Sequence, residues 1–213
     1  MKKIFLLTIL VILIQSCNSQ SKNNIEKENS SVSKPFDLAN LILNEDIYDL
    51  LASVNLSEKD TIKSDKMTLM GNQRLVFNSE EVMLFNKTRL GNKNSLNKNT
   101  VTFHFGKIDQ ELGALNNEKH NIIGMYEINL STKSESDALY SNLNILFGKP
   151  KNVYNLGPVT TFLWVNNNIC YYYFTKDNDE FYRVLIVYKK TDKEWIDFIG
   201  HLGFDNGNLK LVK

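Results

Sequence analysis

The stretch 132–188 constrains the fold of this chain most, because it holds a helix with both ends marked and then a series of strands separated by turn residues. Thr132 and Glu135 have the capping-box spacing, in which a hydroxyl and a carboxylate satisfy free N–H groups of a first helical turn. Gly148 and Pro150 predict where the helix ends, since glycine accepts a left-handed conformation and proline cannot continue a helix. The apolar residues between these signals have helical spacing and predict one buried stripe: Ala138, Leu139, Leu143, Leu146 and Phe147.

Three runs rich in β-branched and aromatic residues follow the predicted helix. The first two, 160–165 and 169–174, are separated by three asparagines and therefore predict a hairpin. The third run, 181–188, follows a polar stretch and predicts a further strand. Thr191 and Glu194 have the same capping-box spacing and predict a short helix that docks through Trp195. Both Trp164 and Trp195 are expected to be buried.

The chain before residue 132 shows the same kinds of pattern. Apolar residues from Leu38 to Val54 are spaced for one helix, or for two short helices joined near Asn44. Polar composition predicts a connector over 54–66 and a long exposed loop over 87–99. The predicted strands of this part, and a last edge strand, are 67–70, 73–77, 81–85, 100–106, 122–130 and 209–212.

Strands joined by short loops, without regular alternation of strands and helices, predict the α+β class, with antiparallel sheets packed on a few helices. With 213 residues and 42% hydrophobic residues, the chain can bury one good core or two small ones. The pattern therefore leaves open whether the fold consists of two similar helix-plus-sheet halves, 35–131 and 132–213.

The N-terminus has the pattern of a signal peptide. Lys2 and Lys3 precede an apolar run, 4–14, which is shorter than the roughly 20 residues that a membrane-spanning helix needs. This run ends in Ile14-Gln15-Ser16-Cys17, which resembles the lipobox of bacterial lipoproteins. The resemblance implies that residues 1–16 are removed and that the Cys17 side chain carries lipid. The polar segment 17–34 is then a disordered tether, and 35–213 is the globular α+β domain.

The asparagine- and lysine-rich composition also resembles that of Bacteroidota lipoproteins. This resemblance implies a membrane-anchored protein of the cell envelope, at the outer membrane, and leaves open whether it faces the periplasm or the cell surface. Loss of Lys2 and Lys3 leaves 23 basic against 24 acidic residues, a net charge of −1. A nearly neutral protein gives no electrostatic reason to expect nucleic acid as a partner. With Cys17 lipidated, Cys170 lacks an intramolecular partner and is expected to be a buried thiol.

The sequence offers few residues with the pattern of a catalytic site. A site of His104, Asp109, Glu111 and His120 is conceivable, because the strands that flank this loop could pair. Ordinary surface histidines are the favoured interpretation, since no histidine pair has metal-ligand spacing. We therefore predict neither a cofactor nor a metal. An envelope hydrolase with a site around His104 and His120 is kept as the alternative.

Aromatic residues are concentrated in the last two predicted strands of the sheet, at 171–174, 181–182 and 188. One face of these strands must cover the helix, and the other is either buried under a second layer or left as a binding patch. Arg183 indicates the outer face, because its charge resists burial. Either Tyr171 with Tyr173 or Tyr172 with Phe174 lies beside it, depending on the register, and the candidate patch is Arg183, Tyr171 and Tyr173. The favoured function is a non-enzymatic binding or accessory domain with a protein partner, of the inhibitor, immunity or assembly type.

Overall fold

A computed structural model describes residues 36–65, 72–92, 98–106, 108–109, 114–115, 121–176 and 183–200, all within the compact unit Pro35–Lys213. The helical segments are η1 (Leu38–Asn40), α2 (Ile47–Ser53), η2 (Glu58–Asp60), α3 (Lys133–Phe147) and α4 (Lys193–Ile199). The strands of the main sheet are β1 (Lys63–Asp65), β2 (Gln73–Phe77), β5 (Thr100–Phe105), β8 (Ile123–Asn129), β9 (Asn152–Leu156), β10 (Val159–Asn166), β11 (Ile169–Lys176) and β12 (Arg183–Lys189). Two small hairpins are formed by β3 (Leu84–Phe85) with β4 (Thr88–Arg89) and by β6 (Ile108–Asp109) with β7 (Ala114–Leu115).

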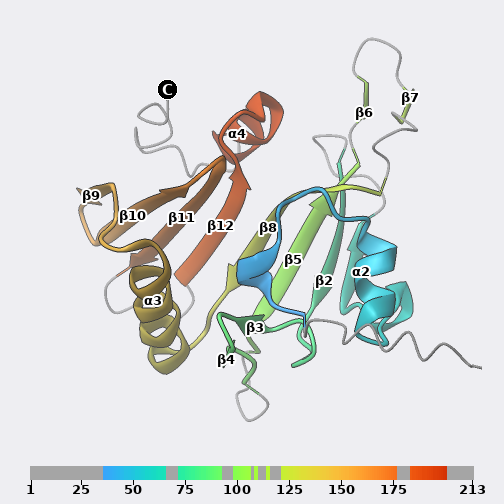
Figure 1. The fold of residues 1–213 in the computed structure, drawn as a ribbon, viewed down its shortest axis with the longest axis horizontal. Coiled ribbons are helices and arrows are strands. Elements are labelled where there is room, and N and C mark those ends of the chain that lie inside the picture. The colour runs from blue at the N-terminus through green and yellow to red at the C-terminus, as the bar shows by residue number, and fades with distance from the viewer. Residues whose placement is uncertain are drawn as a thin grey trace, which may run out of the picture. The chain divides into compact units, whose positions relative to one another are not determined.

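The main sheet has eight strands in the order β1-β2-β5-β8-β12-β11-β10-β9, and all its pairs are antiparallel (Figure 1). The first four strands therefore follow one another across the sheet, and the last four follow one another back toward its middle. The two series meet where β8 pairs with β12. The predicted α+β class with an antiparallel sheet is confirmed, although strands dominate the fold.

Both faces of the sheet are buried near its centre, because successive side chains of each strand belong to different clusters. One cluster includes Phe103, Tyr126 and Leu185 of the sheet, and packs against η1, α2, α3 and the β3–β4 hairpin. The other cluster includes Tyr172 and Ile186 and packs against α4. The aromatic strands β11 and β12 thus lie inside a layered core.

The predicted helices are present, but two of their caps differ. The first helical region forms two segments, η1 and α2, and Asp46 caps the second through the N–H groups of Tyr48 and Asp49. Thr132 is the N-cap of α3, yet its side chain makes no capping hydrogen bond. Asp192, rather than Thr191, caps α4 and accepts from the N–H of Trp195.

The predicted strands agree best with the strands of the structure where side-chain polarity alternates, as in β5. The connector 54–66 contains η2 and β1, and β1 pairs with β2, whereas the predicted first arm of that hairpin, 67–70, lies outside the described residues. Strand β9 was not predicted, because its asparagines are typical of turns rather than of strands. It is an edge strand that pairs with β10. The region 87–99 is not simply an exposed loop, since Leu90 and Asn99 are buried. The edge strand predicted at 209–212 lies outside the described residues.

Gly124 interrupts the regular pairing of β5 with β8. His104 lies opposite Met125 and Phe105 lies opposite Ile123, so that Gly124 is the extra residue of a bulge. The side chain of Trp195 packs directly on this glycine. The bulge therefore gives α4 its docking position, and the predicted burial of Trp195 is confirmed.

Candidate functional site

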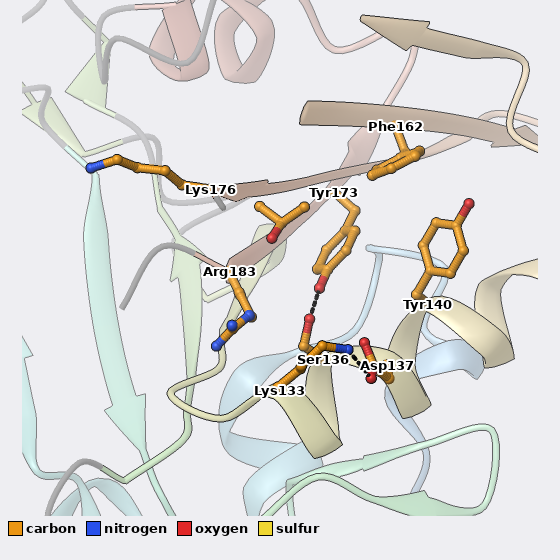
Figure 2. Close-up of a pocket in the computed structure, with 9 residues that line it drawn as sticks. Lys133, Ser136, Asp137, Tyr140, Phe162, Tyr173, Lys176 and Arg183 are labelled. Atoms are coloured by element: carbon orange, nitrogen blue, oxygen red, sulfur yellow. Dashed lines mark hydrogen bonds and ion pairs between the residues drawn. The ribbon is translucent and has the colours of Figure 1, made fainter. Parts of the chain in front are cut away.

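A pocket lies between α3 and the strands β10, β11 and β12 (Figure 2). Its volume is about 510 Å³, which is within the usual range for small-molecule sites. The residues that line it are Lys133, Ser136, Asp137, Tyr140, Phe162, Tyr173, Thr175, Lys176 and Arg183.

The floor of the pocket comes from the pairing of the three strands. Phe162 lies opposite Tyr173, and Tyr173 lies opposite Leu185, which forms a row across the sheet. In the next row on the same face, Thr175 lies opposite Arg183. Because side chains alternate along each strand, both rows face the same helix.

The wall of the pocket is one face of α3. Lys133, Ser136, Asp137 and Tyr140 have the spacing i, i+3, i+4 and i+7, which places them on one side of a helix. The hydroxyl of Ser136 forms a short hydrogen bond with the phenol of Tyr173, which joins wall and floor.

Aromatic rings occupy one side of the pocket. The rings of Tyr140 and Phe162 are edge to face with centroids 4.9 Å apart, and those of Phe162 and Tyr173 are stacked with centroids 6.2 Å apart. Figure 2 shows Arg183 and Lys176 on the side opposite the rings of Tyr140 and Phe162. The pocket therefore has an apolar end and a cationic end.

Three cationic side chains and one carboxylate are among the residues that line the pocket. Nζ of Lys133 lies 2.5 Å from Oδ2 of Asp137, so that this cation is paired along the helix surface. Arg183 and Lys176 add two positive charges among the lining residues. Burial raises the pKa of Tyr173 to about 12, while the hydrogen bond with Ser136 and the charge of Arg183 oppose that rise. The charge of Arg183 thus favours the ionised form of the Tyr173 hydroxyl group at the middle of the pocket.

The predicted patch is only partly brought together, and its orientation was wrong. Tyr173 and Arg183 both line the pocket, but they face α3 rather than the side of the sheet away from it. Tyr171 lies in the core between Phe85 and Phe147, with ring centroids at 6.4 and 4.3 Å. Tyr171 and Tyr173 are each only 2% exposed, so an exposed pair of tyrosines is excluded.

Five lining residues from α3 and β10 were not predicted: Lys133, Ser136, Asp137, Tyr140 and Phe162. For Phe162, a signal was present in the hairpin turn. Asn166 pairs with Ile169, which leaves only Asn167 and Asn168 as the loop, and Asn167 has a φ of 52°. A two-residue loop of this kind fixes the register, and the register places Phe162 beside Tyr173.

His104 lies in a second polar cluster, under α4. Its Nε2 is 2.9 Å from Oε1 of Glu127, and its Nδ1 is 3.0 Å from Nδ2 of Asn72. The rings of Trp195 and Phe198 meet the imidazole edge to face. His104 is 2% exposed, so the expectation of a surface histidine was wrong.

The electrostatics of this cluster favour an ionised Glu127. Burial acts to raise its pKa, but the side-chain hydrogen bonds with His104 and Asn129, with further help from the charge of Arg74, leave the pKa of Glu127 below its ordinary value. A carboxylate accepts from Nε2–H, and the amide of Asn72 then donates to Nδ1. Both ring nitrogens of His104 are thus engaged inside the core.

Of the four side chains of the predicted hydrolytic site, the structure describes His104 alone. His120 and Glu111 lie outside the described residues, as does the side chain of Asp109. Within the described part of the chain, no group of three or more histidine, cysteine, aspartate or glutamate residues is placed to hold a metal ion.

Cys17, the predicted lipidation site, also lies outside the described residues. None of the helices that the structure describes is long and apolar enough to cross a membrane. Comparison of the chain with protein families, with curated proteins and with solved structures finds no match.

Proposed function

We propose that this chain is a lipid-anchored protein of the bacterial envelope and that its folded part is a non-enzymatic binding domain. The observation that carries the proposal is the pocket between α3 and strands β10–β12, where aromatic rings, hydroxyl groups and cationic side chains converge. A concave site with an apolar side and a few convergent polar groups is the usual form of a binding site.

The chemistry of the pocket favours binding over hydrolysis. Ser136 is the hydroxyl that a nucleophilic mechanism would use, but it is bonded to Tyr173, whose pKa is about 12. A group with so high a pKa is poorly matched to proton transfer near neutral pH, where a general base works best.

The anchor in this proposal is lipid on Cys17, at the end of the lipobox-like sequence. The tether 17–34 would hold the domain roughly 20 to 25 Å from the membrane, from the usual dimensions of a flexible chain. The site would therefore meet ligands or proteins of the envelope, as an inhibitor, an immunity factor or an assembly accessory does.

The pocket belongs to the second of two similar halves, 35–131 and 132–213, which we infer from the order of the elements. In each half a helix precedes four strands of the main sheet, which pair in the order of the sequence, and the last strands of both halves, β8 and β12, adjoin. Only the second half has its long helix opposite a cationic side chain on the last strand.

Hydrogen exchange measured by mass spectrometry tests the proposed function. The full chain in detergent is mixed with an envelope extract that has been separated into small molecules and macromolecules. We expect one fraction to slow exchange in peptides that cover α3, β11 and β12, because ligand binding suppresses local opening. Arg183→Ala should remove this protection.

Lys59→Gln is the matched control, because Lys59 is an exposed cation on η2 and does not line the pocket. It should leave the protection unchanged. Protection confined to α4 and its neighbours, or no protection with either fraction, would overturn the assignment of binding to this pocket.

A further inference from the structure

Strand β9 is the outermost strand of the main sheet, and within the described residues it has a neighbouring strand on one side only, β10 (Figure 1). An exposed strand edge is a template for pairing, which proteins usually block with charged side chains, prolines or a short strand. The other edge of the sheet is blocked in this way, since β1 has three residues and two of them are Lys63 and Asp65. Strand β9 has five residues, and none of them is charged or proline. Its edge can therefore accept a further strand.

The side chains of β9 favour an apolar neighbour. Val153 is 53% exposed and Tyr154 is 39% exposed, although valine and tyrosine usually lie at least half-buried in strands. Val153 lies opposite Phe162, on the face of the sheet that carries α3, and Tyr154 lies opposite Thr161, on the other face. Apolar surface is thus uncovered on both sides of the strand edge, where an added strand would cover it.

The turn between β9 and β10 determines which backbone groups of β9 face the open edge. The loop consists of residues 157–158, and Gly157, its first residue, has a φ of 57°. In a two-residue turn of this kind the residues that flank the loop exchange hydrogen bonds, and bonded pairs then alternate with non-bonded pairs along the hairpin. Tyr154 is therefore bonded to β10, whereas the N–H and C=O groups of Val153 and Asn155 point away from it.

A second copy of β9 is complementary to this edge. Opposite residues of antiparallel strands share a face, and the backbone groups that bond must point toward each other. Both conditions are met when Val153 of each copy lies opposite Asn155 of the other, because the N–H and C=O groups of these two residues then bond reciprocally. Tyr154 lies opposite its own counterpart in this register, on the two-fold axis, and forms an aromatic cross-strand pair.

Other two-fold registers use the edge less fully. With Val153 opposite itself, Asn155 would lie opposite Lys151, whose N–H already donates to the carbonyl of Leu163. With Asn155 opposite itself, Val153 would lie against the turn residue Gly157. In the register with Tyr154 on the axis, Lys151 lies opposite Gly157, so that no like charges meet. The net charge of the chain, +1, is also too small for two copies to repel each other strongly.

We infer that two copies of this chain associate through β9, with Tyr154 at the two-fold axis, and that their main sheets join into one. The pairing covers the exposed side chains of Val153 and Tyr154. It stops at a dimer, because a two-fold contact is closed and the other edge of the described sheet, β1, is short and charged. The row Val153, Phe162 and Tyr173 leads from this interface to the floor of the pocket, so the second copy borders its aromatic side.

Disulfide cross-linking tests the register. The full chain carries Cys17→Ser, so that buried Cys170 and one introduced cysteine are its thiols. With copper–phenanthroline as the oxidant, Tyr154→Cys should form a covalent dimer, because Cα atoms of a non-hydrogen-bonded pair lie about 4.5 Å apart, within the disulfide range. Val153→Cys is the matched control, since its counterpart lies two residues along the partner strand, roughly 8 Å away and too far for a disulfide. We expect cross-linking about tenfold or more faster at 154, although Val153 is the more exposed residue.

Sedimentation equilibrium of the full chain in density-matched detergent measures the association itself. We expect a dimer whose dissociation constant rises about tenfold or more in Val153→Pro. Proline removes an N–H group that bonds only to the second copy, and an edge strand tolerates it. Val153→Thr keeps both the N–H group and the β-branched shape, so it should associate like the wild type. Far-UV circular dichroism checks that the proline variant is folded.

A monomer at every concentration would overturn the inference. Hydrogen exchange at Val153 and Asn155 then separates the other occupants of the edge: slow exchange would mean that another segment of the same chain covers it, and fast exchange would leave it to a different protein. Equal cross-linking at 153 and 154 would also overturn the inference, because it would show chance collisions rather than this register. Unchanged association of Val153→Pro would exclude β9 as the interface.

Discussion

The indole of Trp195 occupies the space that a side chain at Gly124 would need, since an added Cβ would lie 2.7 Å from Cζ2 and closer still to Nε1. The contact joins a bulge in β8 to the helix that covers one face of the sheet. It also makes the two positions interdependent, because neither residue can change size without moving the other.

Gly124→Ala should lower the free energy of unfolding by about 1–3 kcal/mol or more, because overpacking forces the indole or the strand to move. Trp195→Ala should cost about 3–5 kcal/mol if the site cannot collapse. In a double-mutant cycle, Gly124→Ala should cost much less once Trp195 is alanine. Urea unfolding measures all four proteins, and purely additive losses would show that the two residues do not compete for space.

The buried His104–Glu127 pair should make stability depend on acidity. The pKa of Glu127 is lowered in the folded protein from its ordinary value of 4.5, so its stabilising effect is complete above pH 4.5. The effect is lost as the pH falls through the lower folded-state pKa. Glu127→Gln should therefore flatten the loss of stability below pH 4.5. Urea midpoints at a series of pH values test this, and equal acid slopes in both proteins would contradict it.

The thiol of Cys170 should be unreactive in the folded protein. Burial raises the pKa of this thiol to about 11, and the side chain is fully buried opposite Tyr188. Because the thiolate is the reactive form, Ellman's reagent at pH 8 should modify it only after unfolding. The assay uses Cys17→Ser, with Cys17→Ser/Cys170→Ser as the blank. Rapid modification without denaturant would mean that this strand is accessible.

Cys17→Ser should release the protein from membranes. The tether that follows Cys17 carries only isolated apolar residues, so the lipid is its expected anchor. Fractionation of cells into membrane and soluble parts measures the change. Ser30→Thr, a change in the tether that leaves Cys17 and the lipobox-like sequence intact, is a control that should remain with the membrane. Recovery of Cys17→Ser in the membrane pellet would contradict the prediction.

The sequence predicts strands well where burial alternates, as at Val101, Phe103 and Phe105 in β5. It predicts burial less well where the place of a residue in the sheet, rather than its residue type, decides whether the side chain is buried. His104 has the polarity of a surface residue, but its partners Asn72 and Glu127 are 32 and 23 residues away in the sequence. Those pairings depend on the whole sheet, so local polarity cannot reveal them.

The pocket was harder to predict than the strands that form it. The residue types of Tyr173 and Arg183 indicate a site, but the predicted face of the sheet is wrong. The prediction places Arg183 on the solvent side because its charge resists burial. In the folded protein Arg183 lies at the end of its strand, where a long side chain can stay half-buried beside α3. The contribution of α3 depends on how the helix crosses the sheet, which its own spacing does not specify.

The pairing of β8 with β12 has a consequence for the order in which the chain can fold. As synthesis proceeds, the strands up to β8 can pair with one another while β12 is still to come. Until β12 arrives, one edge of β8 has no strand beside it, and such an edge invites pairing with other chains. We therefore expect that a chain cut before β12 aggregates. Pairing of β12 with β8 is then the late folding step that removes the exposed edge and protects the protein from aggregation.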